Sequence, residues 1–293
     1  MRTTLVSTSE LAEHGGDWRV FDCRHELADP EKGEALYRQG HIPGALHAHL
    51  DRALSGQATG KNGRHPLPDP AVFAQWLARA GLKNTDQVVA YDDASGAFAA
   101  RLWWMLRWMG HEAVAVLDGG FAKWEQEGRP VETKAPSFAP GSFHGTADDR
   151  MRVDAERLLR NLGRPGEGDT LQADEAGALQ VMDARAASRF AGEGETLDPV
   201  GGHIPGALNR PYALNLGPQG TFKPGEELRS EFTALLGGTA AASVICQCGS
   251  GVTACHNLLA MEIAGLRGAR LYPGSWSEWC SDPERPVARG EQP

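Results

Sequence analysis

The heptapeptide GHIPGAL occurs twice in this chain, at residues 40–46 and at residues 202–208. Each copy follows an apolar stretch that carries an aspartate, VFDCRH (20–25) in the first half and VMDAR (181–185) in the second. Two further matching blocks follow each copy in the same order: VVAYDDASGAFAARLWWML (88–106) and VLDGGFAKW (116–124), then VICQCGSGVTACHNLLAM (244–261) and LYPGSWSEW (271–279). Such an ordered repeat indicates one structural unit present twice, so we interpret the chain as a duplicated domain.

Within each half, short apolar runs alternate with helical patterns. DQVVAY (86–91) is rich in β-branched and aromatic residues, as buried strands are, whereas PAVFAQWLARAG (70–81) has helical spacing and ends at a glycine. AARLWWMLRWMG (99–110) is apolar nearly all round, which is typical of a buried helix. Strands that alternate with helices predict a parallel sheet covered on both faces. We therefore predict an α/β fold of two tandem domains, each a small parallel sheet with helices on both faces.

The boundary between the two domains is expected near the middle of the chain. A length of 293 residues suits two domains better than one. The segment GRPVETKAPSFAPGSFHG (128–145) is rich in proline, glycine and serine, as linkers are. We place the N-terminal domain at residues 1–134, the linker at 135–147 and the C-terminal domain at 148–293.

Composition excludes several classes of partner. The net charge of −9 argues against nucleic acid, because phosphate binding needs clustered lysine and arginine, although a local arginine can still hold a small anion. No apolar run is long enough to span a bilayer, and the N-terminus lacks the apolar core of a secretion signal. Five cysteines, an odd number, suggest thiols rather than a disulfide framework. We expect a cytoplasmic protein with no nucleic-acid or membrane partner.

The second half carries its chemistry in one loop. SVICQ (243–247) has the pattern of a strand, and TACHNLLAMEIAG (253–265) that of a helix, which Thr253 is suited to cap. Cys248 thus lies where a parallel strand ends and a helix begins, the edge at which open α/β sheets bind ligands.

The small residues of this loop have a physical role. Gly249 and Gly251 permit backbone angles that let successive N–H groups turn inward around one centre. Together with a helix N-terminus, such a cradle lowers the pKa of a thiol, and a thiolate held there is a competent nucleophile. We predict that Cys248 is that nucleophile and that Cys246 and Cys255 are buried packing residues.

Other chemistries of cysteine fit less well. Paired C-x-x-C units are absent, which argues against zinc, and the arginine that a cysteine phosphatase needs six residues after its nucleophile is replaced by Ala254. A thiol redox-sensing or binding module that uses Cys246 and Cys248 as a switch remains an alternative from a different class.

Through these blocks the chain resembles, over nearly its whole length, the tandem-domain sulfurtransferases of the rhodanese family. The resemblance implies two rhodanese-like domains, of which only the C-terminal one keeps a reactive cysteine. The counterpart of Cys248 in the first half is Asp92 or Asp93, so that half looks catalytically silent. The loop CGSGVT (248–253) is similar to that of the 3-mercaptopyruvate sulfurtransferases, whereas thiosulfate-using members typically have a basic loop that suits a dianion.

The resemblance also implies a mechanism. The Cys248 thiolate attacks the sulfur of 3-mercaptopyruvate, pyruvate enolate leaves, and a cysteine persulfide remains. Cyanide or a thiol such as thioredoxin or glutathione then takes the terminal sulfur. No metal or organic cofactor is implied, and a monomer is expected because the duplicated domain already forms an internal pseudo-dimer.

Donor-binding residues follow from the same resemblance. Family members grip the substrate carboxylate with arginines after the second aspartate-bearing strand, and Arg189 matches one of them; an arginine fork suits a carboxylate better than lysine does. Arg185 is expected to pair with Asp183 beneath the loop and to help hold the donor. The remaining expected donor-binding residues belong to the loop itself: Gly249, Gly251 and Val252.

The resemblance also suggests groups that assist the chemistry. Ser250 is expected to polarise the substrate carbonyl or relay a proton, and Thr253 to hydrogen-bond the sulfur, although both residue types also cap helices. In mercaptopyruvate members a histidine and an aspartate from the first domain join the serine. His41 fits the histidine and Asp29 loosely fits the aspartate. The expected catalytic residues are therefore Cys248, Ser250, Thr253 and His41.

One departure leaves the donor open. Mercaptopyruvate enzymes usually carry a second arginine shortly before the second heptapeptide, but this chain has no arginine between residues 190 and 203. Thiosulfate or a protein persulfide therefore remains an alternative donor.

Overall fold

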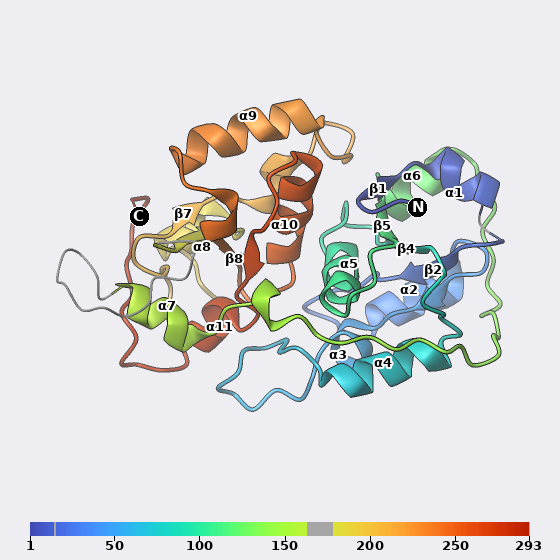
Figure 1. The fold of residues 1–293 in the computed structure, drawn as a ribbon, viewed down its shortest axis with the longest axis horizontal. Helices are drawn as coiled ribbons and strands as arrows, with labels where there is room; N and C mark the ends of the chain where they lie inside the picture. The colour runs from blue at the N-terminus through green and yellow to red at the C-terminus, as the bar shows by residue number, and fades with distance from the viewer. Residues whose placement is uncertain (15, 163–177, 293) are drawn as a thin grey trace. The chain divides into compact units, whose positions relative to one another are not determined.

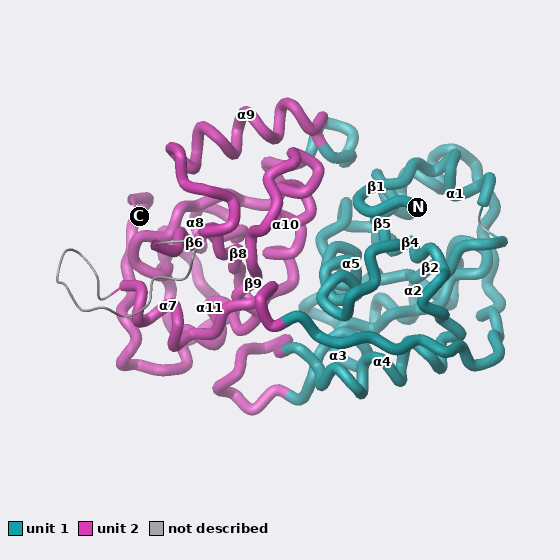
Figure 2. The backbone as a smooth tube through the Cα atoms, in the orientation of Figure 1, with its two compact units in different colours: residues 1–57, 67–148, 216–222 teal, residues 58–66, 149–215, 223–293 magenta. Residues whose placement is uncertain are grey.

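A computed structural model describes residues 1–14, 16–162 and 178–292 as two compact units (Figure 2). Unit 1 comprises residues 1–57, 67–148 and 216–222, and unit 2 comprises residues 58–66, 149–215 and 223–293. Each half therefore lends a short segment to the unit built mainly from the other half. The contiguous domains expected from the sequence miss these two exchanged segments, and the expected linker at 135–147 is part of unit 1.

Unit 1 is a five-stranded parallel sheet with strand order β1-β5-β4-β2-β3 (Figure 1). Its strands are β1 (Leu5–Val6), β2 (Arg19–Asp22), β3 (Leu46–His47), β4 (Val88–Tyr91) and β5 (Val114–Leu117). Its helices are α1 (Thr8–His14), α2 (Lys32–Gln39), α3 (Leu50–Ala53), α4 (Pro70–Arg79), α5 (Ala99–Trp108) and α6 (Gly120–Gln126).

Helices cover both faces of this sheet. Val89 packs in one buried cluster with Leu11 of α1 and Trp124 of α6. Phe21 of the neighbouring strand instead contacts Trp76 of α4, with ring centroids 5.4 Å apart. Successive side chains of a strand point to opposite faces, so strands buried on both sides are apolar throughout. The prediction of a parallel sheet between two helical layers is confirmed for this unit.

Unit 2 repeats the plan with a four-stranded parallel sheet of order β7-β6-β8-β9. Its strands are β6 (Gln180–Asp183), β7 (Leu208–Asn209), β8 (Val244–Gln247) and β9 (Arg270–Leu271). Its helices are α7 (Ala155–Leu162), α8 (Ala187–Ala191), α9 (Gly225–Leu236), α10 (Ala254–Ile263) and α11 (Ser275–Trp279), with short 3-10 turns at Asp149–Met151, Tyr212–Asn215 and Ala241–Ser243. An isolated parallel bridge between Arg152 and Leu271 takes the place that β1 has in unit 1.

Local sequence explains where the elements around the central strands begin and end. Helix α4 starts at Pro70 because the Asp69 side chain accepts hydrogen bonds from the next two free N–H groups. Helix α10 ends just before Gly265, which has a φ of +72°. Thr253 occupies the N-cap of α10, but among the described residues no backbone N–H donates to its side chain, so the expected side-chain cap is not formed.

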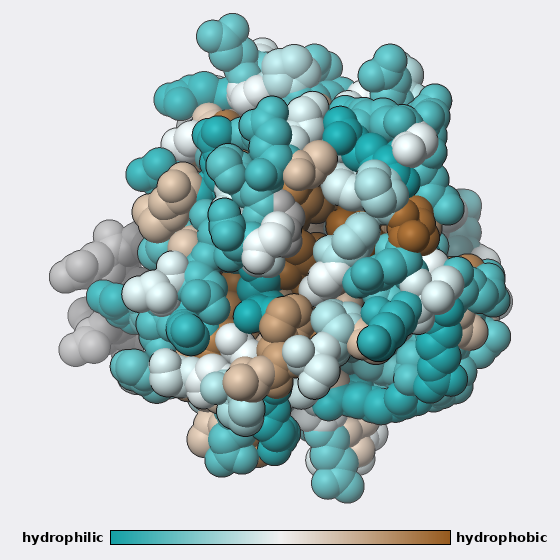
Figure 3. All heavy atoms as spheres, turned by 90° about the vertical axis from the view of Figure 1, so that its right-hand side faces the viewer, coloured by the Kyte–Doolittle hydropathy of each residue, from teal (hydrophilic) through white to brown (hydrophobic). Residues whose placement is uncertain are grey.

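Unit 1 also has a cavity of about 440 Å³ whose lining includes Asp17, Arg19 and Gly44. Figure 3 shows the face of the molecule on which apolar residues gather around a hollow. Arg19 begins β2 and Gly44 precedes β3, so this cavity lies near the amino ends of the strands rather than at their carboxyl ends. None of the helices in the described residues is both long and apolar enough to cross a bilayer.

Candidate active site

Strand register shows which residue of unit 1 corresponds to Cys248. In unit 2, Asp183 of β6 pairs with Gln247 at the end of β8. In unit 1, Asp22 of β2 pairs with Tyr91 at the end of β4. The residue that follows each central strand is therefore Cys248 in one unit and Asp92 in the other. Of the two counterparts that the sequence left open, the register selects Asp92.

The loop after β4 shows what this position does in unit 1. The buried carboxylate of Asp92 accepts hydrogen bonds of 2.8–2.9 Å from four backbone N–H groups. Those donors are Ala94, Gly96, Phe98 and Ala99. Burial nevertheless raises the pKa of Asp92, with the four N–H groups opposing that effect. A loop between the central strand and its helix thus surrounds an anion with N–H groups in this fold.

In unit 2 the corresponding loop, residues 248–253, is the cysteine loop. Cys248 is only 2% exposed, and its N–H donates to the Ser275 hydroxyl at 3.1 Å. The Cys248 carbonyl accepts from the N–H of Trp276, and the Gly249 carbonyl accepts from that of Ser277. The first turn of α11 therefore fixes the backbone on which the thiol is carried.

The two glycines of the cysteine loop are there for different reasons. Gly251 has a φ of +77°, and a Cβ on it would lie 2.3 Å from the Pro273 carbonyl oxygen, so the loop needs a glycine there. Gly249 lies outside the left-handed region, contrary to the expectation that both glycines supply unusual angles. A Cβ on Gly249 would instead lie 2.9 Å from Nη2 of Arg64 and 3.5 Å from Nη1 of Arg189. Gly249 leaves room for two guanidinium groups.

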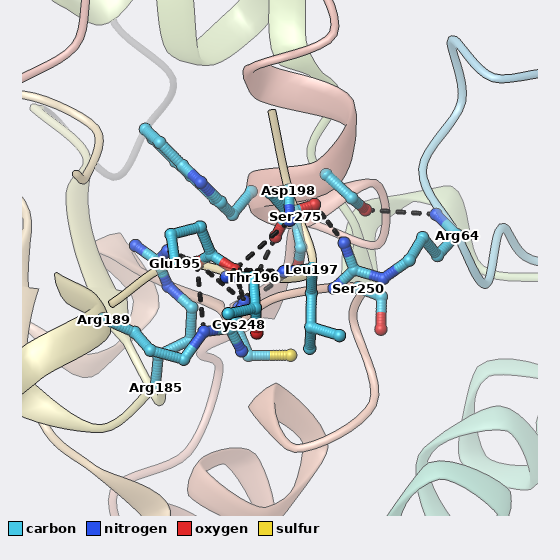
Figure 4. A network of polar contacts seen from close by, with 12 residues as sticks. Arg64, Arg185, Arg189, Glu195, Thr196, Leu197, Asp198, Cys248, Ser250 and Ser275 are labelled. Atoms are coloured by element: carbon cyan, nitrogen blue, oxygen red, sulfur yellow. Dashed lines mark hydrogen bonds and ion pairs between the residues drawn. The ribbon is translucent and has the colours of Figure 1, made fainter. Parts of the chain in front are cut away.

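These guanidinium groups are held by two buried acids (Figure 4). Arg189 donates from Nε and Nη2 to Glu195, and from Nη2 to Asp198 at 3.2 Å. Arg64, which reaches the network from the exchanged segment 58–66, donates from Nη1 to the other oxygen of Asp198. The side chains of Glu195 and Asp198 are 4% and 2% exposed. Burial raises the pKa of Asp198, and the charge of Arg64 opposes that effect.

A serine–histidine pair lies in the same unit. Nδ1 of His65 is 2.7 Å from Oγ of Ser250, and both residues are buried. Sequence reasoning assigned this place to His41, but the histidine that contacts Ser250 is His65 of the exchanged segment. Asp29, the loose match for a third member, is exposed and its N–H bonds to the Glu26 carbonyl.

His41 has a structural role that its repeat partner shares. Its ring stacks on Tyr37 at 4.0 Å and its Nδ1 is 2.8 Å from the Tyr37 carbonyl oxygen. His203 stacks on Phe190 at 3.7 Å and bonds the Phe190 carbonyl oxygen in the same way. Because the arrangement recurs in both units, it belongs to the fold rather than to one site.

Sequence reasoning missed Arg64 and His65 because they lie in a loop without periodicity. Comparison of the two halves of the repeat could have drawn attention to this loop. Segment 58–66 follows β3 and α3, and segment 216–222 follows β7 at the matching place in the second half. Both exchanged segments are thus the same loop of the repeat.

Known proteins match this chain over nearly its whole length. The Rhodanese-like domain family matches residues 7–127 and 168–282. The chain is 48% identical over 291 residues to a probable 3-mercaptopyruvate sulfurtransferase of Pseudomonas aeruginosa, covering 98% of each chain. It is 33% identical to the thiosulfate sulfurtransferase of Bos taurus, covering 98% of this chain and 96% of that one. The chain belongs to the rhodanese family of sulfurtransferases.

A solved structure agrees with this assignment. The 3-mercaptopyruvate sulfurtransferase of Leishmania major superposes with a TM-score of 0.80 at 30% identity, over 94% of this chain and 74% of that one. The duplicated rhodanese fold anticipated from the heptapeptides is confirmed by these matches.

Each of the two rhodanese units contains its own copy of the same buried ion pair. Arg185 donates from Nε and Nη2 to Asp183 and from Nη2 to the Gly202 carbonyl. Arg24 makes the same contacts with Asp22 and the Gly40 carbonyl in unit 1. Since unit 1 has an aspartate in place of the cysteine, a contact present in both units serves the fold. Arg185 thus forms the structural ion pair with Asp183 that the sequence suggested.

The other residues of the sequence-based site are placed as follows. Val252 is 3% exposed in the cysteine loop, and Thr253 precedes α10. Cys246 is fully buried in β8, and burial raises its pKa well above the ordinary value. Cys255 is buried in α10, with Sγ 3.5 Å from the Gly251 carbonyl oxygen. A thiol that is hard to ionise is a poor nucleophile, which favours packing as the role of Cys246.

Proposed function

We propose that this protein transfers sulfur from 3-mercaptopyruvate, through a persulfide on Cys248, to cyanide or to a thiol. The observation that carries the proposal is the place of Cys248, since the same position in unit 1 holds a carboxylate among four N–H groups. The four N–H groups offset part of the cost of burying a carboxylate there, and N–H groups placed in the same way would offset the cost of burying a thiolate and the persulfide formed from it.

The proposed reaction has two half-reactions that pass through Cys248. The Cys248 thiolate forms an S–S bond with the donor sulfur, and the electrons of the C–S bond leave with the pyruvate enolate. The enolate oxygen needs a hydrogen-bond donor, and its carbon later takes a proton. Ser250, bonded to His65 at 2.7 Å, supports this role because a histidine can pass a proton through a hydroxyl. In the second half-reaction the acceptor attacks the terminal sulfur and the thiolate is regenerated.

The charges near the cysteine loop favour a monoanionic donor. The positive charges of Arg64 and Arg189 are matched by the negative charges of Glu195 and Asp198. No surplus positive charge is then left in this group of four residues to offset both charges of thiosulfate. Thiosulfate remains the alternative donor, since no arginine occurs between residues 190 and 203 and a thiosulfate sulfurtransferase is among the relatives.

Steady-state kinetics with both donors test this choice. With cyanide as acceptor, we expect kcat/KM for 3-mercaptopyruvate to exceed that for thiosulfate by about tenfold or more, because an extra like charge about 4 Å from the thiolate costs about 1–4 kcal/mol. A higher value for thiosulfate would reverse the donor assignment while leaving the family intact. Turnover of neither donor would contradict sulfur transfer itself.

The role of the serine–histidine pair is tested by His65→Gln. We expect kcat with 3-mercaptopyruvate to fall about 10²- to 10⁴-fold, the usual contribution of a positioned acid or base. The rate with thiosulfate should change little, because its leaving group, sulfite, has no enolate to protonate. His144→Gln, which alters an exposed histidine, is the control and should leave both rates unchanged. An equal loss with both donors would assign His65 a structural role.

We further propose a cytoplasmic protein that acts as a monomer on a thiol acceptor such as thioredoxin or glutathione. All five cysteines are free thiols, which suits a reducing compartment. The chain already contains two rhodanese units, which favours a monomer.

A further inference from the structure

We propose that unit 1 binds a divalent transition-metal ion of the zinc type through His25, His49 and Asp51. One ring nitrogen of each histidine and one carboxylate oxygen of Asp51 all lie within 4.8 Å of one another. Two imidazoles and a carboxylate are a ligand set that zinc takes in proteins, with a fourth position left to water. All three residues belong to unit 1, so the proposal goes beyond sulfur transfer and does not depend on it.

The three side chains come together at the edge of the sheet where this type of fold binds ligands. Strands β2 and β3 are parallel neighbours, with Asp22 paired to His47. His25 follows the carboxyl end of β2, and His49 follows that of β3. Open α/β sheets bind ligands outside the carboxyl ends of their strands, and Cys248 follows the carboxyl end of β8 in unit 2. The unit without the cysteine thus has potential ligands at the same edge of its sheet.

The ligand residues are not part of what the two units share. Alignment of VFDCRH (20–25) with VMDARA (181–186), and of the two heptapeptides, places Ala186, Pro211 and Ala213 opposite the three ligand residues. None of these three side chains can bind a metal ion. Because unit 2 has the same fold without such groups, the fold alone does not account for the two histidines and the aspartate in unit 1.

His49 is in the tautomer that a metal ligand needs. The residue is 5% exposed, and its Nδ1 accepts a hydrogen bond from the N–H of Asp51 at 3.2 Å. Nδ1 therefore carries a lone pair, and it lies 3.9 Å from Oδ2 of Asp51. A metal ion between Nδ1 and this oxygen would take the place of the hydrogen bond. The proton of the neutral ring is then on Nε2.

A carboxylate lies near Nε2 of His49. This nitrogen is buried, and no group in the described part of the chain accepts a hydrogen bond from it. Oε1 of Glu31 is 3.9 Å away, and Arg52 holds Glu31 by donating to both of its oxygens. A histidine that binds a metal ion usually donates its other N–H to a carboxylate, which fixes the ring and raises its basicity. A small shift of Glu31 would complete that contact when the ion binds.

The neighbouring histidines differ in their contacts. His25 is 8% exposed, and its ring lies edge-on to the rings of His49 and Phe98, with centroids 5.8 Å and 5.4 Å away. The ring of His47 is 5.7 Å from that of His49, but its Nε2 bonds the Arg24 carbonyl oxygen at 3.2 Å. His47 therefore lies beside the ligand set without belonging to it.

Calorimetric titration of the whole chain with Zn²⁺ tests the site. We expect one ion to bind, and Glu31→Gln to weaken binding about 10- to 100-fold, the usual effect of losing the partner of a ligand. His25→Asn, His49→Asn and Asp51→Ala should each weaken it further, because each removes a ligand. Asparagine is a good N-cap, so His49→Asn keeps the start of α3, and Asp51 is exposed enough for its substitution to leave the fold intact.

His47→Asn is the matched control. Unit 2 has Asn209 at this position, and its amide donates to the Arg185 carbonyl as His47 bonds that of Arg24. This variant should bind Zn²⁺ as wild type does. Loss of binding equal to that of His49→Asn would overturn the ligand set.

Co²⁺ as a spectroscopic probe separates this site from one at a cysteine. Bound through nitrogen and oxygen, Co²⁺ should give visible absorption bands without the charge-transfer band that a thiolate ligand adds. The three ligand variants should lose these bands. A thiolate charge-transfer band alone, binding unchanged in all three variants, or no binding of Zn²⁺ by wild type would overturn the proposal. None of these measurements uses sulfur transfer, so their outcome is independent of the proposed function.

Discussion

Cys248→Ser is expected to abolish sulfur transfer from both donors, with kcat/KM falling about 10⁴-fold or more. A serine hydroxyl is not ionised at neutral pH and is a much weaker nucleophile toward sulfur than a thiolate, and no S–S bond can form on it. The hydroxyl is close in size to the thiol, so the loop contacts of Cys248 with Ser275 and Trp276 should survive. Retention of more than a small fraction of activity would contradict the assigned nucleophile.

Mass spectrometry of the intermediate completes this prediction. Wild type treated with donor and no acceptor should gain the mass of one sulfur atom on the peptide that contains Cys248, and cyanide should remove it. Cys280→Ser is a suitable control, because burial raises the pKa of Cys280 to about 11 and keeps that thiol protonated. Loss of two hydrogens across Cys246 and Cys248 without added sulfur would instead favour the redox-switch alternative.

The place of Cys248 between a strand and a helix was predictable from the sequence because its context is local. A strand pattern, a loop with two glycines and a helical pattern follow one another between residues 243 and 265, and β8 and α10 occur there. The reason for Gly249 was not predictable, since it depends on the guanidinium groups of Arg64 and Arg189, which arrive from distant parts of the chain. A loop can require a glycine for its backbone angle or for the space left by the missing side chain. The sequence alone does not distinguish these two requirements.

The partner of Ser250 was mispredicted for a related reason. The identical heptapeptides drew attention to His41, but both copies need that histidine to bond a neighbouring carbonyl. A residue conserved between two copies of a repeat serves what the copies share, and only one copy carries the cysteine. Arg64 and His65, which contact the residues around Cys248, lie instead in the exchanged segment 58–66.

Loss of either buried ion pair, Arg24–Asp22 or Arg185–Asp183, is expected to lower stability strongly. Arg24→Ala and Arg185→Ala should each lower the free energy of unfolding of their own unit by about 3–5 kcal/mol, because each leaves a fully buried aspartate, Asp22 or Asp183, without its guanidinium partner. Urea unfolding followed by hydrogen exchange with peptide-level mass spectrometry measures each unit separately, which is needed because two units need not unfold as one.

The matched pair of variants decides whether Arg185 also binds the donor. Arg24 is the control, because its unit carries Asp92 where unit 2 carries Cys248. If Arg185 only supports the fold, both variants lose similar stability, and at a temperature where both remain folded Arg185→Ala keeps the wild-type KM for 3-mercaptopyruvate. A KM raised tenfold by Arg185→Ala in folded protein would instead place the Arg185 guanidinium on the donor. The Nη1 of Arg185, 4.0 Å from Glu195, is the atom that such a role would use, since Nε and Nη2 are bound to Asp183.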